Sequence, residues 1–153
     1  MIKRVYIDTS VFGGYFDKEF YQPTKDFFEA INERNVTILV TEILELEIYK
    51  APDHIIELFE SLSNIERVEL TDETNLLAEK YISEKVVGKT SIADCQHIAL
   101  ATIYKADVLA SWNFKHIVNL ERIRAYNSIN FREGYQMIEI RTPNEIFSDE
   151  SSQ

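Results

Sequence analysis

The sequence is poor in cysteine and has no long apolar segment. Its single cysteine, Cys95, excludes an internal disulfide and a zinc-finger pattern. We expect Cys95 to be a small buried apolar residue on a helix. No apolar run reaches the roughly 18 residues that a membrane span requires. Met1–Arg4 leads into a predicted strand instead of the long apolar segment of a secretory signal, so we expect a cytoplasmic protein that does not bind membranes.

Basic residues are also scarce. The chain has 16 Lys and Arg against 26 Asp and Glu, which gives a formal net charge of −10 at pH 7. This balance argues against broad, non-specific attraction to nucleic acid, which normally requires a basic face. An acidic surface suits a basic partner protein. The composition still allows contact with phosphates, provided that some of the acids hold cations and that local basic residues such as Lys115 face the phosphates.

The 153 residues, 45% of them hydrophobic, suffice for one domain with a sizeable core. We predict a single domain over residues 1–147 and a polar, frayed tail over 148–153. Strand patterns alternate with helix patterns, which predicts an α/β fold with a mainly parallel sheet covered on both faces. The predicted strands are 2–8, 36–40, 65–70, 108–110 and 137–140, and the predicted helices are 24–33, 41–50, 53–62, 72–84, 90–105 and 119–128. Thr41 is expected to cap the second of these helices, Thr71-Asp72 to open the fourth, and Gly13-Gly14 to interrupt the chain.

The first predicted strand stops at Asp8, and Thr9 and Ser10 follow at once. An acid at this point lies at the carboxyl edge of a buried sheet, where open α/β folds bind their ligands. Two other roles remain open for Asp8, which are capping of a short helix after the strand and acceptance of a phosphoryl group. The phosphoacceptor role ranks last, because Ser10 stands two positions later where a second aspartate is needed.

Two further acids lie beside apolar helix patterns. Glu47 shares a helix face with Ile43 and Leu44, which turns it inward, although most glutamates on such a helix are solvated surface groups. Asp94 falls in the first turn of the strongest predicted helix, where the helix dipole alone favours an acid. It also shares a stripe with core-like residues such as Ile98, and an acid there is costly unless it is paired or metal-bound.

These three acids point to a metal site if the fold brings them together. Carboxylates that meet in one cleft repel one another by about 4 kcal/mol per pair at 4 Å and an effective dielectric constant of 20. A cation between Asp8, Glu47 and Asp94 removes this cost. The sequence therefore predicts a divalent-metal site.

Polar residues after the strand 108–110 bear on the identity of the metal. Asn113 either forms a turn or offers its amide oxygen to a hard cation. His97 and His116 are expected to be hydrogen-bonded structural groups, because no second histidine or cysteine stands at zinc spacing. The oxygen-rich donor set favours Mg²⁺ or Mn²⁺ over zinc.

Several of these residues lie in segments that resemble PIN-domain proteins, in the order and spacing that this family uses. The resemblance spans nearly the whole chain, and the last two segments are similar to one branch of bacterial PIN proteins. The segments are Val5-Tyr6-Ile7-Asp8-Thr9-Ser10-Val11, Thr41 to Ile48, Ser91-Ile92-Ala93-Asp94, Ser111-Trp112-Asn113-Phe114-Lys115-His116-Ile117 and Arg141-Thr142-Pro143.

The resemblance implies a three-layer sandwich with a mainly parallel sheet of about five strands flanked by helices. Typical members of the family are metal-dependent ribonucleases, including VapC-like toxins of toxin–antitoxin pairs. It therefore implies hydrolysis of RNA with Mg²⁺ or Mn²⁺, a small antitoxin as partner, and a homodimer. The alternative is a catalytically weak PIN-fold module that binds RNA or protein.

By the same resemblance, Asp8, Glu47 and Asp94 match the three core acids of the family residue by residue. Asn113 stands where the family often has a further aspartate and is the fourth predicted metal ligand. Asn113 lacks the negative charge of that aspartate, which weakens the case for a second metal and for activity. This difference motivates the binding-module alternative. Weaker candidates for substrate contacts are Thr9, Ser10, Lys115 and His116.

Overall fold

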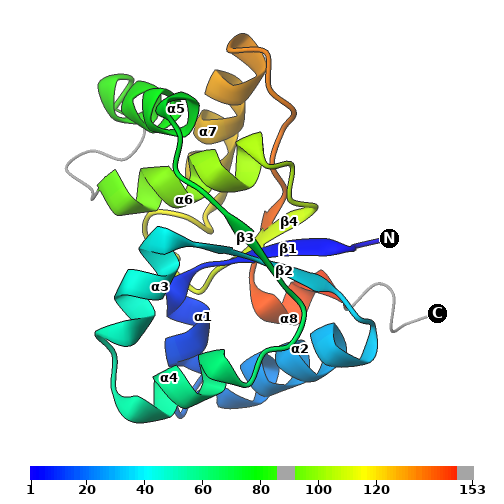
Figure 1. Cartoon of the computed structure of the whole chain (residues 1–153). Coiled ribbons are helices and arrows are strands. Elements are labelled where there is room, and N and C mark those ends of the chain that lie inside the picture. The colour runs from blue at the N-terminus through cyan, green and yellow to red at the C-terminus, as the bar shows by residue number, and fades with distance from the viewer. Residues whose placement is uncertain (86–91, 148–153) are drawn as a thin grey trace.

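Five short strands form one sheet in the computed structural model, which describes residues 1–85 and 92–147. The predicted polar tail, 148–153, lies outside the described residues, as do Thr90 and Ser91 at the predicted start of a helix. The strands are β1 (Arg4–Ile7), β2 (Thr37–Thr41), β3 (Ile65–Val68), β4 (Val108–Ala110) and β5 (Ile140–Arg141). All pairs are parallel in the order β3-β2-β1-β4-β5, which confirms the predicted sheet (Figure 1).

Helices cover both faces of this sheet (Figure 1). Within the described ranges, none of them combines the length and apolar character that spanning a lipid bilayer requires. The helices are α1 (Thr9–Gly14), α2 (Tyr21–Glu33), α3 (Glu42–Tyr49), α4 (Asp53–Glu60), α5 (Asp72–Ser83), α6 (Ile92–Ile103), α7 (Leu120–Arg132) and α8 (Pro143–Ile146).

Each face of the sheet has its own hydrophobic core, because successive side chains of a strand point to opposite faces. Tyr6 and Leu109 belong to the core formed with α5, α6 and α7. Val5 and Ile7 belong to the core formed with α1 to α4 and α8. The predicted α/β sandwich of three layers is therefore confirmed, and the free Cys95 is buried in the first of these cores as expected.

Local start signals behave as the sequence predicted. Thr41 caps α3, since its hydroxyl oxygen accepts a hydrogen bond from the backbone N–H of Leu44 at 3.2 Å. Thr71 caps α5 in a reciprocal capping box with Thr74. These caps fix where two of the connections from strand to helix end.

The prediction that Gly13 and Gly14 interrupt the chain is wrong, because both lie within α1. A Cβ on Gly13 would meet nothing within 4 Å, whereas a Cβ on Gly14 would lie 2.7 Å from two atoms of the Trp112 indole. Gly14 therefore serves close packing inside the molecule instead of a turn.

The last predicted strand, 137–140, is also corrected, since β5 begins only at Ile140. The Asn127 side chain holds both backbone groups of Ile138, accepting from its N–H at 2.7 Å and donating to its carbonyl at 3.0 Å. These bonds to α7 replace the strand pairing that the alternating pattern of this segment predicts.

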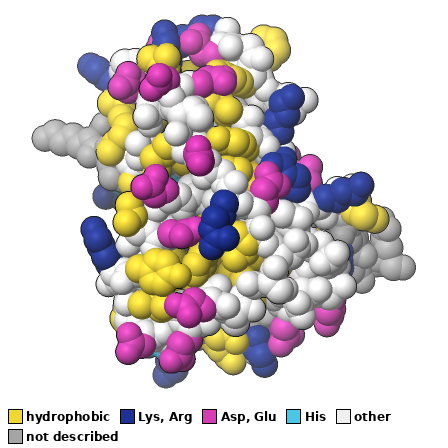
Figure 2. Space-filling model, in the orientation of Figure 1, with side chains coloured by type: hydrophobic (Ala, Val, Ile, Leu, Met, Phe, Trp, Pro, Cys, Tyr) yellow, Lys and Arg dark blue, Asp and Glu magenta, His cyan; other side chains and the backbone are white. Residues whose placement is uncertain are grey.

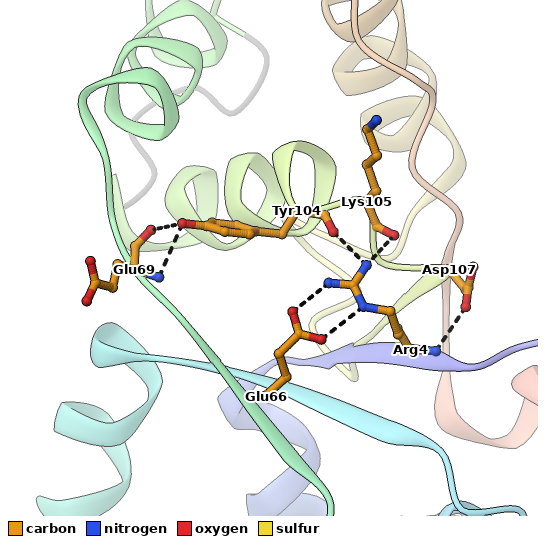
Figure 3. A network of polar contacts seen from close by, with 6 residues as sticks. All are labelled: Arg4, Glu66, Glu69, Tyr104, Lys105 and Asp107. Carbon is orange, nitrogen blue, oxygen red and sulfur yellow. Dashed lines mark hydrogen bonds and ion pairs between the residues drawn. The ribbon is translucent and has the colours of Figure 1, made fainter.

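Arg4 at the amino end of β1 ties three elements together (Figure 3). Its guanidinium donates to both carboxylate oxygens of Glu66 on β3, at 3.1 and 2.8 Å. It also donates to the carbonyls of Tyr104 and Lys105, at 2.7 and 3.0 Å, which lie just beyond the end of α6. Asp107 accepts from the backbone N–H of Arg4 at 2.9 Å. The amino end of the central strand is thus bound to the carboxyl end of α6.

Candidate active site

The carboxyl end of β1 lies where the strand order reverses. The chain runs from β1 outward to β2 and β3, then crosses back to place β4 and β5 on the other side of β1. Open parallel sheets bind their ligands at such a point, beyond the carboxyl ends of the strands. Ile7 pairs with Ala110, so Asp8 and Ser111 are the first residues beyond two paired strands.

The Asp8 carboxylate is held by hydroxyl groups at this point. Its Oδ2 accepts hydrogen bonds from Ser10 Oγ at 2.8 Å and from Ser111 Oγ at 2.7 Å, and the residue is only 5% exposed. No described residue donates to its other oxygen. Asp8 occupies the N-cap position of α1 but makes no side-chain capping bond, so the capping alternative does not account for this carboxylate.

Glu47 on α3 faces the same region. One carboxylate oxygen accepts a short hydrogen bond from Thr9 Oγ1, and the other accepts from His97 Nε2 at 3.3 Å. His97 lies on α6 and is 1% exposed, and its Nδ1 forms a 2.5 Å hydrogen bond with the Tyr6 hydroxyl on β1. Glu47 is thereby joined to the central strand from two sides.

These contacts shift the protonation of both partners. Burial by itself raises the pKa of Glu47, but the hydrogen bonds from His97 and Thr9 outweigh it, so the pKa lies below its ordinary value. Burial lowers the pKa of His97, but the bond to Glu47 and the charges of Asp8, Glu47 and Asp94 outweigh it, so this pKa is raised. The carboxylate of Glu47 and the protonated imidazole therefore stabilise each other.

Asp94 is half-buried in the first turn of α6, one helical turn before His97. Its charge acts on the His97 ring together with the charges of Asp8 and Glu47. All three acids therefore act electrostatically on the same buried imidazole.

Whether a metal ion fits these acids depends on the chemistry of the donor atoms and on how closely the side chains are grouped. Carboxylate oxygens are the donors that Mg²⁺ and Mn²⁺ prefer, so the chemistry of the donor set suits a hard divalent cation. Within residues 1–85 and 92–147, however, no group of three or more His, Cys, Asp or Glu side chains is arranged closely enough to hold a metal ion. The donors have the right chemistry, whereas the close grouping is not formed by the described side chains.

The segment after β4 is arranged around Asn113. Its Oδ1 accepts from the backbone N–H of His116 at 3.0 Å, and its own N–H donates to Ser111 Oγ at 2.9 Å. These bonds are those of a turn residue, and the predicted role of Asn113 toward a metal stays a prediction. Lys115 is exposed in this turn. Among the described residues, His116 Nδ1 is buried without a hydrogen-bond partner.

Two residues of this site, Ser111 and Tyr6, were not predicted from the sequence as site residues. They stood only within segments that resemble PIN-domain proteins. The signal for Ser111 was present, since it follows β4 as Asp8 follows β1. His97 was predicted to be a hydrogen-bonded structural group, which its bonds to Tyr6 and Glu47 confirm, but its partner acid could not be foreseen.

Comparison with known proteins agrees with this architecture. A chain in the crystal structure of VapBC2 from Rickettsia felis, bound to a DNA fragment from their promoter, superposes with a TM-score of 0.56 at 14% sequence identity. The match covers 91% of the present chain and 98% of the other, and it shows a shared fold. No curated protein matches the sequence.

The family is shown by the sequence itself. The profile of the PIN domain matches residues 5–115, which include all three predicted acids. The chain therefore belongs to the PIN-domain family, as its motifs predicted. PIN domains are generally nucleases, so membership of the family supports a hydrolase class of activity.

Proposed function

We propose that this protein is a divalent-metal-dependent endoribonuclease that hydrolyses RNA phosphodiester bonds. The observation that carries the proposal is that hydrogen bonds join Glu47 to the segment around Asp8, directly through Thr9 and through His97 to Tyr6. Asp94 lies one helical turn before this His97. These three acids are the ones that match the family motifs, and they come from the ends of β1, α3 and α6. Membership of the PIN family supports the nuclease class.

Asp8, Glu47 and Asp94 would hold Mg²⁺ or Mn²⁺, with Asn113 as a further oxygen donor. Such an ion, when bound, lowers the pKa of a water molecule and offsets charge on the phosphate in the transition state. The chain's own groups support this arrangement. Ser10 and Ser111 hold Asp8 Oδ2, and Thr9 and His97 fix the two oxygens of Glu47. Oriented carboxylates of this kind depend on such supporting hydrogen bonds.

Weaker substrate contacts are assigned to residues at the rim of the site. Ser10 lies against the Asp8 carboxylate, and Lys115 is exposed in the turn after β4, where its charge can meet a phosphate. Thr9 and His116 complete the set that the sequence predicted. Thr9 donates to Glu47 and Ser10 donates to Asp8, so both hydroxyls after Asp8 already support predicted metal ligands.

We further propose that the protein is the toxin of a toxin–antitoxin pair, since it shares its fold with a chain of a VapBC complex. Apolar side chains near the acids support a protein partner there, because Leu46 on α3 is 57% exposed and Ile92 on α6 is 46% exposed. Figure 2 shows acidic side chains scattered over the visible face, which suits a basic partner. A homodimer is proposed as well, on the resemblance alone.

The partner proposals have direct tests. The reading frame next to this gene is expected to encode a small protein that co-purifies with this chain and suppresses cleavage. Sedimentation of the purified chain alone is expected to give the mass of two copies. A neighbouring product that neither binds nor inhibits would contradict the antitoxin, and a monomer at micromolar concentration would contradict the homodimer.

Two glutamates on α3 allow a matched test of catalysis. Glu47→Gln keeps the shape of the side chain but removes the charge, so metal-dependent cleavage of a labelled RNA panel is expected to be abolished. Glu45→Gln changes a neighbouring half-buried glutamate that pairs with Arg67 instead of His97, and cleavage should be unchanged. Asp94→Asn is expected to behave as Glu47→Gln does. Far-UV circular dichroism verifies that all three variants fold, and equal turnover by Glu47→Gln and wild type would refute the proposed site.

A second candidate is favoured by a specific observation. No described group of three acids or other metal-binding side chains is close enough for a cation, and Asn113 Oδ1 is engaged by the backbone of His116. These facts favour a PIN-fold module that binds RNA or protein with little catalysis. Titration of Mg²⁺ and Mn²⁺ against the RNA panel separates the candidates, because binding without product under both ions would select the binding module.

A further inference from the structure

The segment after β4 carries aromatic residues, and its backbone is hydrogen-bonded to the acid site. Trp112 follows Ser111, and its backbone N–H donates to Ser10 Oγ at 2.9 Å. Ser10 Oγ in turn donates to Asp8 Oδ2 at 2.8 Å. The backbone of Trp112 is therefore two hydrogen bonds from the carboxylate at the centre of the proposed site.

Three rings from two separate segments form one group, which we name the aromatic ledge: Phe20, Trp112 and Phe114. The rings of Phe20 and Trp112 are stacked, with centroids 4.5 Å apart and an angle of 28° between their planes. The Phe114 ring lies 6.1 Å from each of them and is 50% exposed. The ledge thus presents an exposed aromatic side chain two residues after Trp112, whose backbone is bonded to Ser10.

The indole at the centre of the ledge is fixed in orientation. Trp112 Nε1 donates to Thr24 Oγ1 at 2.9 Å, and Thr24 is fully buried. The Thr24 hydroxyl donates to the Phe20 carbonyl at 2.6 Å, which links the two segments of the ledge. The edge of the indole also rests on Gly14, where a Cβ would lie 2.7 Å from it. The Trp112 ring is thus held on three sides and gives Phe114 a fixed neighbour, with 6.1 Å between the ring centroids.

We propose that the aromatic ledge stacks an unpaired base of single-stranded RNA, with Phe114 as the ring that contacts the base. This inference rests on the proposed nuclease function and names the form of its substrate. Proteins that bind single strands stack bases on aromatic rings, and this contact needs no positive charge. It therefore suits a chain with a net charge of −10, for which attraction to phosphates is limited.

The position of the ledge favours RNA over a protein partner. The backbone of Trp112 is joined to Asp8 through Ser10, so a base on Phe114 would belong to a strand that passes the acid site. Lys115 is exposed at the next position, where its charge can meet the backbone of the same strand. The exposed apolar groups assigned to a protein partner, such as Leu46, belong to α3 and not to the ledge.

The chain offers a direct optical probe, because Trp112 is its only tryptophan. Oligo(U) and oligo(A) are expected to quench Trp112 emission without added metal, whereas a fully paired RNA duplex is not. Phe114→Ala is expected to weaken oligonucleotide binding by about tenfold and to raise KM with kcat unchanged. Phe114→Tyr keeps an aromatic face and should restore wild-type binding. Phe131→Ala, which truncates a 77% exposed ring on α7, is the matched control and should change neither quantity.

The outcomes separate this inference from the proposed function. Cleavage of RNA with unchanged Trp112 emission and an unchanged KM for Phe114→Ala would overturn the aromatic ledge and leave the nuclease intact. Quenching by single strands without cleavage under Mg²⁺ or Mn²⁺ would support the ledge while the nuclease proposal fails. Quenching by the product of the neighbouring gene, but not by RNA, would assign the ledge to a protein and overturn the inference.

Discussion

The two adjacent glycines of α1 allow the packing of Trp112 to be tested with almost identical substitutions. A Cβ on Gly13 meets nothing within 4 Å, so Gly13→Ala adds a methyl group in open space. A Cβ on Gly14 meets Trp112 Cδ1 and Nε1 at 2.7 Å and Thr24 Oγ1 at 3.0 Å. The indole cannot withdraw freely, since Phe20 stacks on it and Thr24 holds its Nε1.

Gly13→Ala and Gly14→Ala are expected to change the free energy of unfolding in opposite directions. Replacing a helical glycine by alanine stabilises the folded state by about 0.5–1 kcal/mol, which is the expected gain for Gly13→Ala. Gly14→Ala has the same gain, but forcing a methyl group into a filled space costs about 1–3 kcal/mol. We therefore expect Gly14→Ala to be less stable than the wild type by up to about 2.5 kcal/mol. The two variants share the gain and should differ by the cost alone, about 1–3 kcal/mol, or roughly 2–12 °C in Tm for a chain of this size.

Urea unfolding followed by far-UV circular dichroism measures both free energies of unfolding. Trp112 emission reports the indole separately, and its maximum should shift in native Gly14→Ala but not in native Gly13→Ala. If Gly14→Ala were as stable as Gly13→Ala, with unchanged emission, the indole would not rest on Gly14. The rigidity argued for the aromatic ledge would then be refuted.

Three further predictions concern the tie at Arg4, a helix cap and the metal. Arg4→Met is expected to lower the free energy of unfolding by about 1–2 kcal/mol, whereas Arg67→Met, which loses a pair whose Arg side chain is 68% exposed, should cost under about 0.5 kcal/mol. Because the hydrogen bond from Arg4 lowers the pKa of Glu66, the cost of Arg4→Met in urea unfolding should shrink as the pH falls through the range where Glu66 is protonated. Thr71→Ala removes the α5 cap and should cost about 1 kcal/mol in the same assay, and a cost near zero would contradict the capping box. A chelator is expected to abolish RNA cleavage while circular dichroism stays unchanged, since both cores are apolar; cleavage that survives the chelator would exclude the metal.

Much of the fold could be predicted because its signals are local. The buried run before Asp8 and the cap at Thr41 depend on neighbouring residues alone, and both are as predicted. Gly13 and Gly14 misled the prediction because a helix-breaking residue and a close-packing residue look alike in sequence. The contact that explains Gly14 comes from Trp112, far along the chain.

The site was predictable in part for a related reason. The three acids stand at or near the ends of strand or helix patterns, and such patterns can be recognised in a single sequence. The acids are Asp8, Glu47 and Asp94. The bond from Ser111 to Asp8 depends on the register between β1 and β4, which periodicity does not encode. The bond between His97 and Glu47 depends on how α6 lies against α3, and neither helix alone contains this information.

The hydrogen bonds made by Arg4 have a consequence for the evolution of this protein (Figure 3). Asp8 and Arg4 stand at opposite ends of one short strand, and Arg4 grips the far end of the helix that carries Asp94 and His97. The Arg4 side chain therefore helps to set how β1 and α6 lie relative to each other. A substitution of Arg4 is expected to change the spacing of the acids without altering any of them. Variation in activity among relatives should therefore be sought at this remote end as well.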